Sequence, residues 1–131
     1  MTKFTNFEVG RFGEAQCAKY VKKVKKYKVI ARNATIGKLE VDIIATDKEY
    51  IIFIEVKTRC STKDRLYRPG DAIDWRKRQN LINFANAYCS RLPAKLRDKA
   101  PRIDACEIYL DSSGKKLRVC ELNYIEGAVT R

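Results

Sequence analysis

The chain has 131 residues, a length that fits one domain spanning residues 1–131 better than two. It carries 28 Lys and Arg against 16 Asp and Glu, a net charge of +12, which favours a polyanionic partner: nucleic acid first, an anionic membrane surface second. The absence of histidine excludes Ser-His-Asp and Cys-His hydrolases and histidine-ligated zinc, so any hydrolysis must rely on carboxylates, lysine and a hard metal ion.

In chain order, hydrophobic periodicity and turn residues predict two helices and five strands. Thr5 and Glu8 have the spacing of a capping box that would open the first helix. A three-strand meander follows, then a second helix capped by Asp74 and two late strands, and the tail from Asn123 is expected to be loose. The predicted helices span about 6–25 and 74–91, and the predicted strands about 27–35, 39–46, 50–58, 102–110 and 116–122. This α-β-β-β-α-β-β order predicts one α/β domain with a central mixed sheet flanked by helices.

The third predicted strand carries an acidic and a basic residue on one face, where Ile51, Phe53, Glu55 and Lys57 follow one another. The preceding strand carries Asp42, and neighbouring strands lie about 4.8 Å apart, so Asp42 can approach Glu55 closely. Adjacent carboxylates repel unless a proton or a cation lies between them, and Mg²⁺ prefers one or two carboxylates with waters and phosphate oxygens. The pattern therefore predicts a site for Mg²⁺ or Mn²⁺, with a plain cross-strand salt-bridge cluster as the alternative.

Glu14 lies three and four residues before Cys17 and Ala18 on the apolar stripe of the first helix, so we expect its side chain to point toward the sheet. Asp42 and Glu55 would hold the metal, with Glu14 as a further ligand of the metal or of water. Lys57 would orient or help deprotonate the attacking water, or neutralise the phosphate. A surface position for Glu14 is the alternative interpretation.

Asp42 followed by Glu55-Val56-Lys57 on the next strand stands within an ordered set of sequence blocks. The blocks are GE at 13–14, ARN at 31–33, EVDIIA at 40–45, FIEVKTR at 53–59, AIDWRK at 72–77 and RID at 102–104. Together they resemble the YraN family of bacterial proteins, within the PD-(D/E)xK nuclease superfamily and its restriction-endonuclease-like fold. The resemblance covers about residues 10–110.

The YraN family is similar in fold and site to archaeal Holliday-junction resolvases. The resemblance therefore implies a Mg²⁺- or Mn²⁺-dependent endodeoxyribonuclease that hydrolyses phosphodiester bonds in DNA, with branched, structured or single-stranded DNA as candidate substrates. It also implies that Glu14, Asp42, Glu55 and Lys57 are the catalytic residues. Resolvase-like action on two strands would suggest a homodimer.

Basic residues near the predicted site are candidate contacts with nucleic acid. They are Arg59, Lys63, Arg65 and Arg68 around the loop after the third strand, and Lys77 in the second helix. The neighbouring Trp75 is expected to pack in the core or against a helix rather than to stack on a base.

Two other functions compete with a nuclease. A non-catalytic nucleic-acid-binding module that retains the nuclease fold is favoured by the basic bias and by Leu39, which stands where the YraN family usually has glycine before Glu40. A basic adaptor for a protein partner has less support. The two functions differ in one property, because only the module would keep its affinity for nucleic acid at physiological salt.

The five cysteines are widely spaced and form no CxxC pair, which favours free thiols in a reducing cytoplasm. No apolar run approaches the roughly 20 residues that span a membrane, and the first ten residues lack the apolar segment of a secretory signal. We therefore expect a cytoplasmic protein without a membrane partner.

Overall fold

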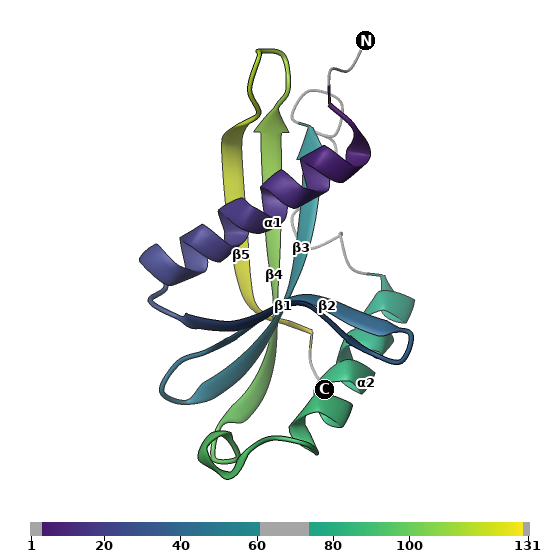
Figure 1. The fold of residues 1–131 in the computed structure, drawn as a ribbon, viewed down its shortest axis with the longest axis vertical. Coiled ribbons are helices and arrows are strands. Elements are labelled where there is room, and N and C mark those ends of the chain that lie inside the picture. The colour runs from purple at the N-terminus through teal and green to yellow at the C-terminus, as the bar shows by residue number, and fades with distance from the viewer. Residues whose placement is uncertain (1–3, 61–73, 130–131) are drawn as a thin grey trace.

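The computed structural model describes residues 4–60 and 74–129, and the elements follow one another in the predicted α-β-β-β-α-β-β order (Figure 1). The helices are α1 Asn6–Lys23 and α2 Trp75–Cys89, with a short 3-10 helix at Ala94–Leu96. The strands are β1 Lys28–Ile36, β2 Leu39–Thr46, β3 Tyr50–Cys60, β4 Ala100–Asp111 and β5 Arg118–Val129. The observed α1 and α2 end two residues before the predicted ends, a normal deviation for helix termini.

The strands form one sheet in the order β1-β2-β3-β4-β5. All neighbours are antiparallel except β3 and β4, which run parallel over Tyr50↔Ala100 to Cys60↔Leu110. A parallel pair needs a long crossover, and the chain makes it through α2. The predicted mixed sheet is confirmed, and the strand that carries Glu55 lies at its centre.

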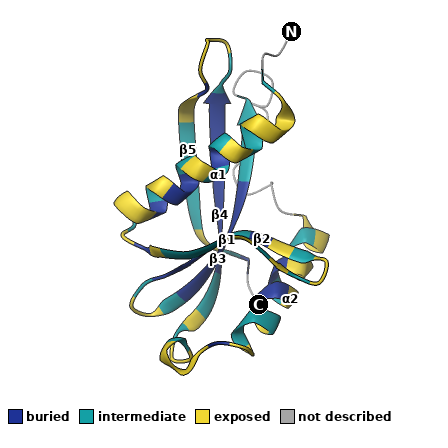
Figure 2. Cartoon of the chain, in the orientation of Figure 1, coloured by how far each residue is buried: buried dark blue, intermediate teal, exposed yellow. Residues whose placement is uncertain are grey.

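The two helices cover opposite faces of the sheet (Figures 1 and 2). Ile52 and Ile54 of β3 pack in one buried cluster with α1, whereas Ile51 and Phe53 pack in another with α2. Alternate residues of a strand point to opposite faces, so Glu55 shares the face of Phe53, as predicted, and the structure shows that α2 covers this face. In the part of the chain that is described, no helix is long and apolar enough to cross a membrane.

Helix α1 begins at the predicted capping box, in which Thr5 Oγ1 accepts from the Glu8 backbone N–H and the Glu8 carboxylate accepts from the Thr5 N–H. Further along, α1 lies directly against β3 at Gly13. A Cβ at Gly13 would stand 2.0 Å from Thr58 Oγ1, so only glycine permits this contact. The contact fixes the position of Glu14 relative to the strand that carries Glu55 and Lys57.

Strand β5 corrects the prediction of a loose tail after Asn123, because it continues to Val129 and pairs with β4. The fully buried Asp104 carboxylate holds this segment: it accepts from both Nε and Nη2 of Arg102 at 2.9 Å, from Tyr124 Oη at 2.5 Å and from the Gly127 N–H at 2.9 Å. A buried carboxylate is stable when its oxygens are paired in this way. The sequence showed the polar residues of the tail but not their distant partner.

Candidate functional site

The candidate site lies where β2 separates from β3. The pairing between these strands ends at Ile43↔Ile54, one residue short of Asp42. From there the Asp42 carboxylate, rather than the β2 backbone, accepts from the Val56 N–H at 2.8 Å. The break in the ladder thus brings the Asp42 side chain beside Glu55, as the sequence predicted for neighbouring strands.

Glu55 is a buried carboxylate, with 5% of its surface exposed. Its Oε2 lies 3.1 Å from Nζ of Lys77, which reaches over from the first turns of α2. Burial and the neighbouring Asp42 charge raise the pKa of Glu55 to about 7, although the positive charges of Lys77 and Lys57 oppose the shift. The position therefore disfavours a second negative charge unless a cation compensates it.

Asp42 and Glu14 share this environment. Burial raises the pKa of Asp42, against the opposing effects of the Val56 N–H and the Lys77 charge. The pKa of Glu14 is also raised, first by burial and then by the Asp42 charge, while Arg32 opposes the shift. Glu14 thus lies within electrostatic reach of Asp42 and lines one cavity with Asp42 and Glu55.

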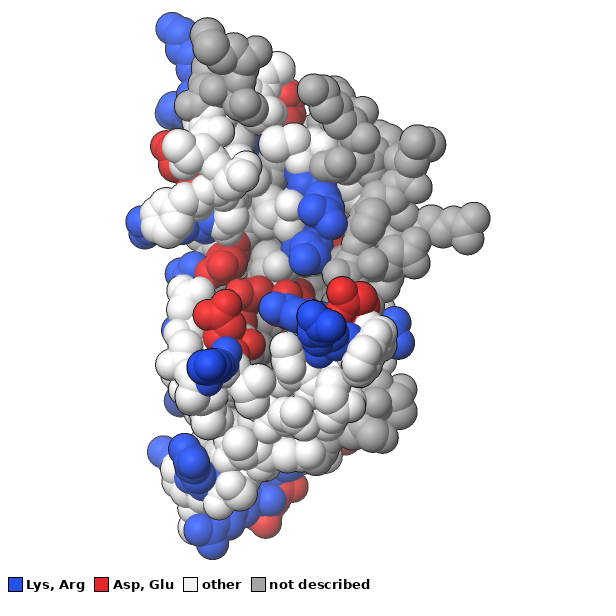
Figure 3. Space-filling view, turned by 90° about the vertical axis from the view of Figure 1, so that its right-hand side faces the viewer, with Lys and Arg blue, Asp and Glu red and all other residues white. Residues whose placement is uncertain are grey.

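A cavity of about 390 Å³ opens over these carboxylates. Its lining includes Glu14 from α1, Asp42 from β2, and Glu55, Thr58 and Arg59 from β3. Figure 3 shows acidic side chains gathered in the middle of this side of the molecule, with basic side chains around them. A small depression with acids at its floor and bases at its rim can admit a cation together with a phosphate group.

The donor set fits a hard divalent cation. Asp42 and Glu55 offer carboxylate oxygens, and Lys77 places one positive charge against Glu55. Burial raises the pKa of both acids and so disfavours their charged forms. Within residues 4–60 and 74–129, no three carboxylate or thiol side chains converge as a ready-made three-residue metal site. Mg²⁺ suits this arrangement, since it commonly takes one or two carboxylates and completes its shell with water and phosphate oxygens.

The other predicted residues fall into three groups. Lys57 is half-buried and stands two residues after Glu55 on the same face of β3, and Arg59 lines the cavity. Lys77, predicted as a nucleic-acid contact, is a direct partner of Glu55. Lys63, Arg65 and Arg68 lie outside the described residues.

Sequence reasoning missed two neighbours of the site and misplaced one. Asn33 of β1 has a positive φ of 51° and lines a surface hollow together with Glu14, and only the unusual Asn after Arg32 could have suggested it. Glu107 of β4 is 2% exposed and lies in register with Lys57, a pairing that only the parallel register reveals. Trp75 is 76% exposed, so the prediction that it packs in the core or against a helix is wrong.

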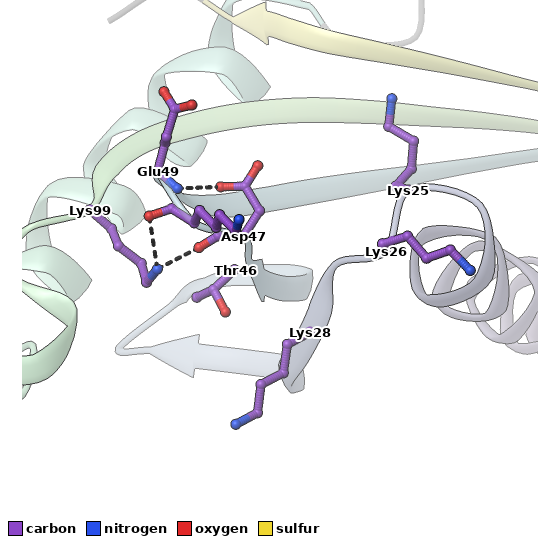
Figure 4. A pocket seen from close by; sticks show the side chains of 8 residues that line it. Lys25, Lys26, Lys28, Thr46, Asp47, Glu49 and Lys99 are labelled. Carbon is purple, nitrogen blue, oxygen red and sulfur yellow. Dashed lines mark hydrogen bonds between the residues drawn. The ribbon is translucent and has the colours of Figure 1, made fainter.

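A second cavity, of about 610 Å³, lies at the beginning of β3, roughly 20 Å along the strand from Glu55. It is lined by Lys25, Lys26, Lys28, Thr46, Asp47, Lys48, Glu49 and Lys99 (Figure 4). Lys99 donates to the backbone oxygens of Asp47 and Lys48, and Lys25 pairs with Glu126. The cavity is basic but holds no cluster of buried acids, so it resembles an anion-binding surface rather than a catalytic site.

Comparison with known proteins gives a consistent result. The model of the uncharacterised protein family UPF0102 matches residues 13–108. A UPF0102 protein of Caldanaerobacter subterraneus subsp. tengcongensis is 35% identical over 98% of this chain and 99% of its own length. A UPF0102 protein of Acetivibrio thermocellus is 32% identical over 91% of this chain and 88% of its own length. A UPF0102 protein of Clostridium botulinum is 40% identical over 65% of this chain and 67% of its own length.

Proposed function

The chain belongs to the uncharacterised protein family UPF0102, the YraN family that its sequence blocks resemble, and we propose that it is a Mg²⁺- or Mn²⁺-dependent endonuclease of the PD-(D/E)xK type acting on DNA. One observation carries the proposal: the Asp42 carboxylate leaves the β2–β3 ladder and lies beside the buried Glu55, with Lys57 on the same strand. A buried Glu55 beside a partly buried Asp42 is unfavourable in a purely structural role, and a bound cation would offset the repulsion between the two carboxylates.

Each residue has a role in this proposal. Asp42 and Glu55 would hold the divalent cation, which activates water and offsets the charge that develops on the phosphate. Lys57 would orient the attacking water or neutralise a phosphate oxygen, and Glu14 would hold a water molecule from the α1 side. Lys77, which pairs with Glu55 at the edge of the site, would contact the DNA backbone there.

The test is a cleavage panel of single-stranded, duplex, flap and four-way-junction DNA with Mg²⁺ and with Mn²⁺. We expect the wild-type protein to cleave at least one substrate, and Asp42→Ala and Lys57→Ala each to lower the rate at least about a hundredfold, because each removes a group that acts on the reacting phosphate. Asp98→Asn, at an exposed carboxylate, is the matched control and should keep the wild-type rate. Equal cleavage by wild type and both site variants would falsify the proposal.

A second candidate function is a nucleic-acid-binding module without chemistry, and the Lys77–Glu55 ion pair favours it, because the amine already compensates the buried acid. Such a module would bind nucleic acid with a steep salt dependence and would be insensitive to Asp42→Ala. Metal-dependent turnover that Asp42→Ala abolishes would exclude it.

A further inference from the structure

A hollow on the α1 side adjoins the carboxylate cavity. It has a volume of about 420 Å³, within the range of small-ligand pockets, and is lined by Asn6, Phe7, Gly10, Arg11, Glu14 and Asn33. Asn6, Gly10 and Glu14 line both this hollow and the carboxylate cavity, so the two lie side by side. A ligand with two neighbouring groups can therefore place one at the hollow and the other at the carboxylate cavity.

The hollow presents an aromatic ring to solvent. Phe7 is 71% exposed, and Arg11, one helical turn later, places its guanidinium carbon 5.5 Å from the centre of the ring. Contact between water and an exposed aromatic side chain is unfavourable, and the side chain contributes nothing to the hydrophobic core. A ring with a cation beside it is the combination that binds nucleobases, through stacking on the ring and attraction of the phosphate.

The hollow also has polar lining residues. Asn33 is held at a φ of 51°, a conformation that asparagine tolerates better than most residues, and it lines the hollow together with Glu14. Asn6 lines the same hollow from the first turn of α1. Carboxamides both donate and accept hydrogen bonds, so they match the edges of nucleobases.

We propose that this hollow binds the base of an unpaired nucleotide, stacked on Phe7, whose neighbouring phosphate lies in the carboxylate cavity. The inference rests on the proposed function and names its substrate class: nucleic acid with a single-stranded region next to the scissile phosphate, rather than intact duplex. In a duplex both faces of each base are already covered by stacking, so a base must first leave the helix to reach the ring.

The test measures binding in EDTA, so that no cleavage occurs, to a fluorescent single-stranded oligonucleotide and to the matching blunt duplex. We expect tighter binding to the single strand, and Phe7→Ala to weaken that binding about fivefold to hundredfold while changing duplex binding less than twofold. Phe7→Trp should restore wild-type affinity because it restores a ring face. Val24→Ala, which truncates an exposed apolar residue at the other end of α1, is the matched control and should have no effect.

A 2-aminopurine base in the single strand gives a second readout, since stacking quenches its fluorescence. Quenching by wild type and Phe7→Trp but not by Phe7→Ala supports the proposal. It is overturned if Phe7→Ala binds the single strand as wild type does, if it weakens both substrates equally, or if wild type binds neither. Metal-dependent cleavage is measured in a separate assay. If the protein stacks bases but does not cleave DNA, only the proposed nuclease activity is refuted. If it cleaves DNA but Phe7→Ala has no effect on binding, only the proposed base-binding site is refuted.

Discussion

Glu55 is the residue of the site whose negative charge is most disfavoured by its surroundings. It lies in the sheet centre beside another acid, and its ion-pair partner is Lys77, which is itself partly exposed. Because burial raises its pKa to about 7, Glu55 takes up a proton in the folded protein at pH values where the unfolded chain has lost it. Folding and protonation are therefore linked at this residue.

The linkage predicts how the stability of the metal-free protein depends on pH. Since the folded-state pKa of Glu55 is raised, its contribution is fully present below about pH 4.5 and is lost as the pH rises toward 7. The glutamine in the Glu55→Gln variant cannot ionise, so the stability of the variant lacks this dependence on pH. We expect the free energy of unfolding of the variant, relative to that of wild type, to rise by roughly 3 kcal/mol between about pH 4.5 and pH 7. Urea denaturation in EDTA across this pH range measures the difference.

The control for this experiment is Glu49→Gln, which changes an exposed carboxylate in the β2–β3 turn. Its difference from wild type should stay constant across the same pH range. If the difference in free energy of unfolding between Glu55→Gln and wild type is also constant, Glu55 ionises normally in the folded protein. The argument that the charged form of Glu55 needs a cation would then no longer hold.

At the scale of elements, the contact between α1 and β3 determines where Glu14 lies. Gly13→Ala would place a methyl group 2.0 Å from Thr58 Oγ1, so the helix must move away from the strand. We expect a loss of about 1–3 kcal/mol in the free energy of unfolding, as for other overpacked contacts, together with weaker metal-dependent activity because Glu14 moves with the helix. Thermal and urea denaturation measure the first effect.

Gly10 supplies the matched control, because a Cβ there would meet nothing within 4 Å and the residue lies in the same helix. Gly10→Ala should stabilise the protein by up to about 1 kcal/mol through helix propensity. The double variant Gly13→Ala/Thr58→Ala should recover part of the loss, since the obstructing hydroxyl is removed. Identical losses in the single and double variants would show that the contact does not fix the helix.

At the scale of the whole molecule, the net charge of +12 predicts salt-dependent binding of nucleic acid. Each lysine that neutralises a phosphate adds about 0.7 to 0.9 to the slope of log affinity against log salt. Lys26, Lys28 and Lys48 line the second cavity, so we expect their joint replacement by Gln to lower the slope by about 2 for a long single strand.

Joint replacement of the same three lysines by Arg keeps the charge and should keep the slope. A short strand that reaches only the carboxylate cavity should show the same slope for all variants, because the second cavity lies roughly 20 Å away along β3. If the Gln variant keeps the wild-type slope on the long strand, this basic surface takes no part in binding nucleic acid.

The sequence by itself determined the order of the elements and indicated most residues of the candidate site. Alternation in 50–58 identified the face of Glu55, the apolar stripe of the first helix directed Glu14 inward, and the absence of histidine limited hydrolysis to carboxylates with a metal. These features are local, because period, caps and turns depend on residues a few positions apart. The short ordered blocks added the family, which the comparisons confirm.

Only the tertiary structure decided contacts between residues far apart in the chain. The sequence could not show that the β2–β3 ladder stops before Asp42, that Lys77 pairs with Glu55, or that Asp104 holds the end of β5. It also misplaced Trp75, because a large aromatic side chain is buried or exposed according to what packs around it. Strand register and helix docking bring such residues together, and neither is encoded in local periodicity.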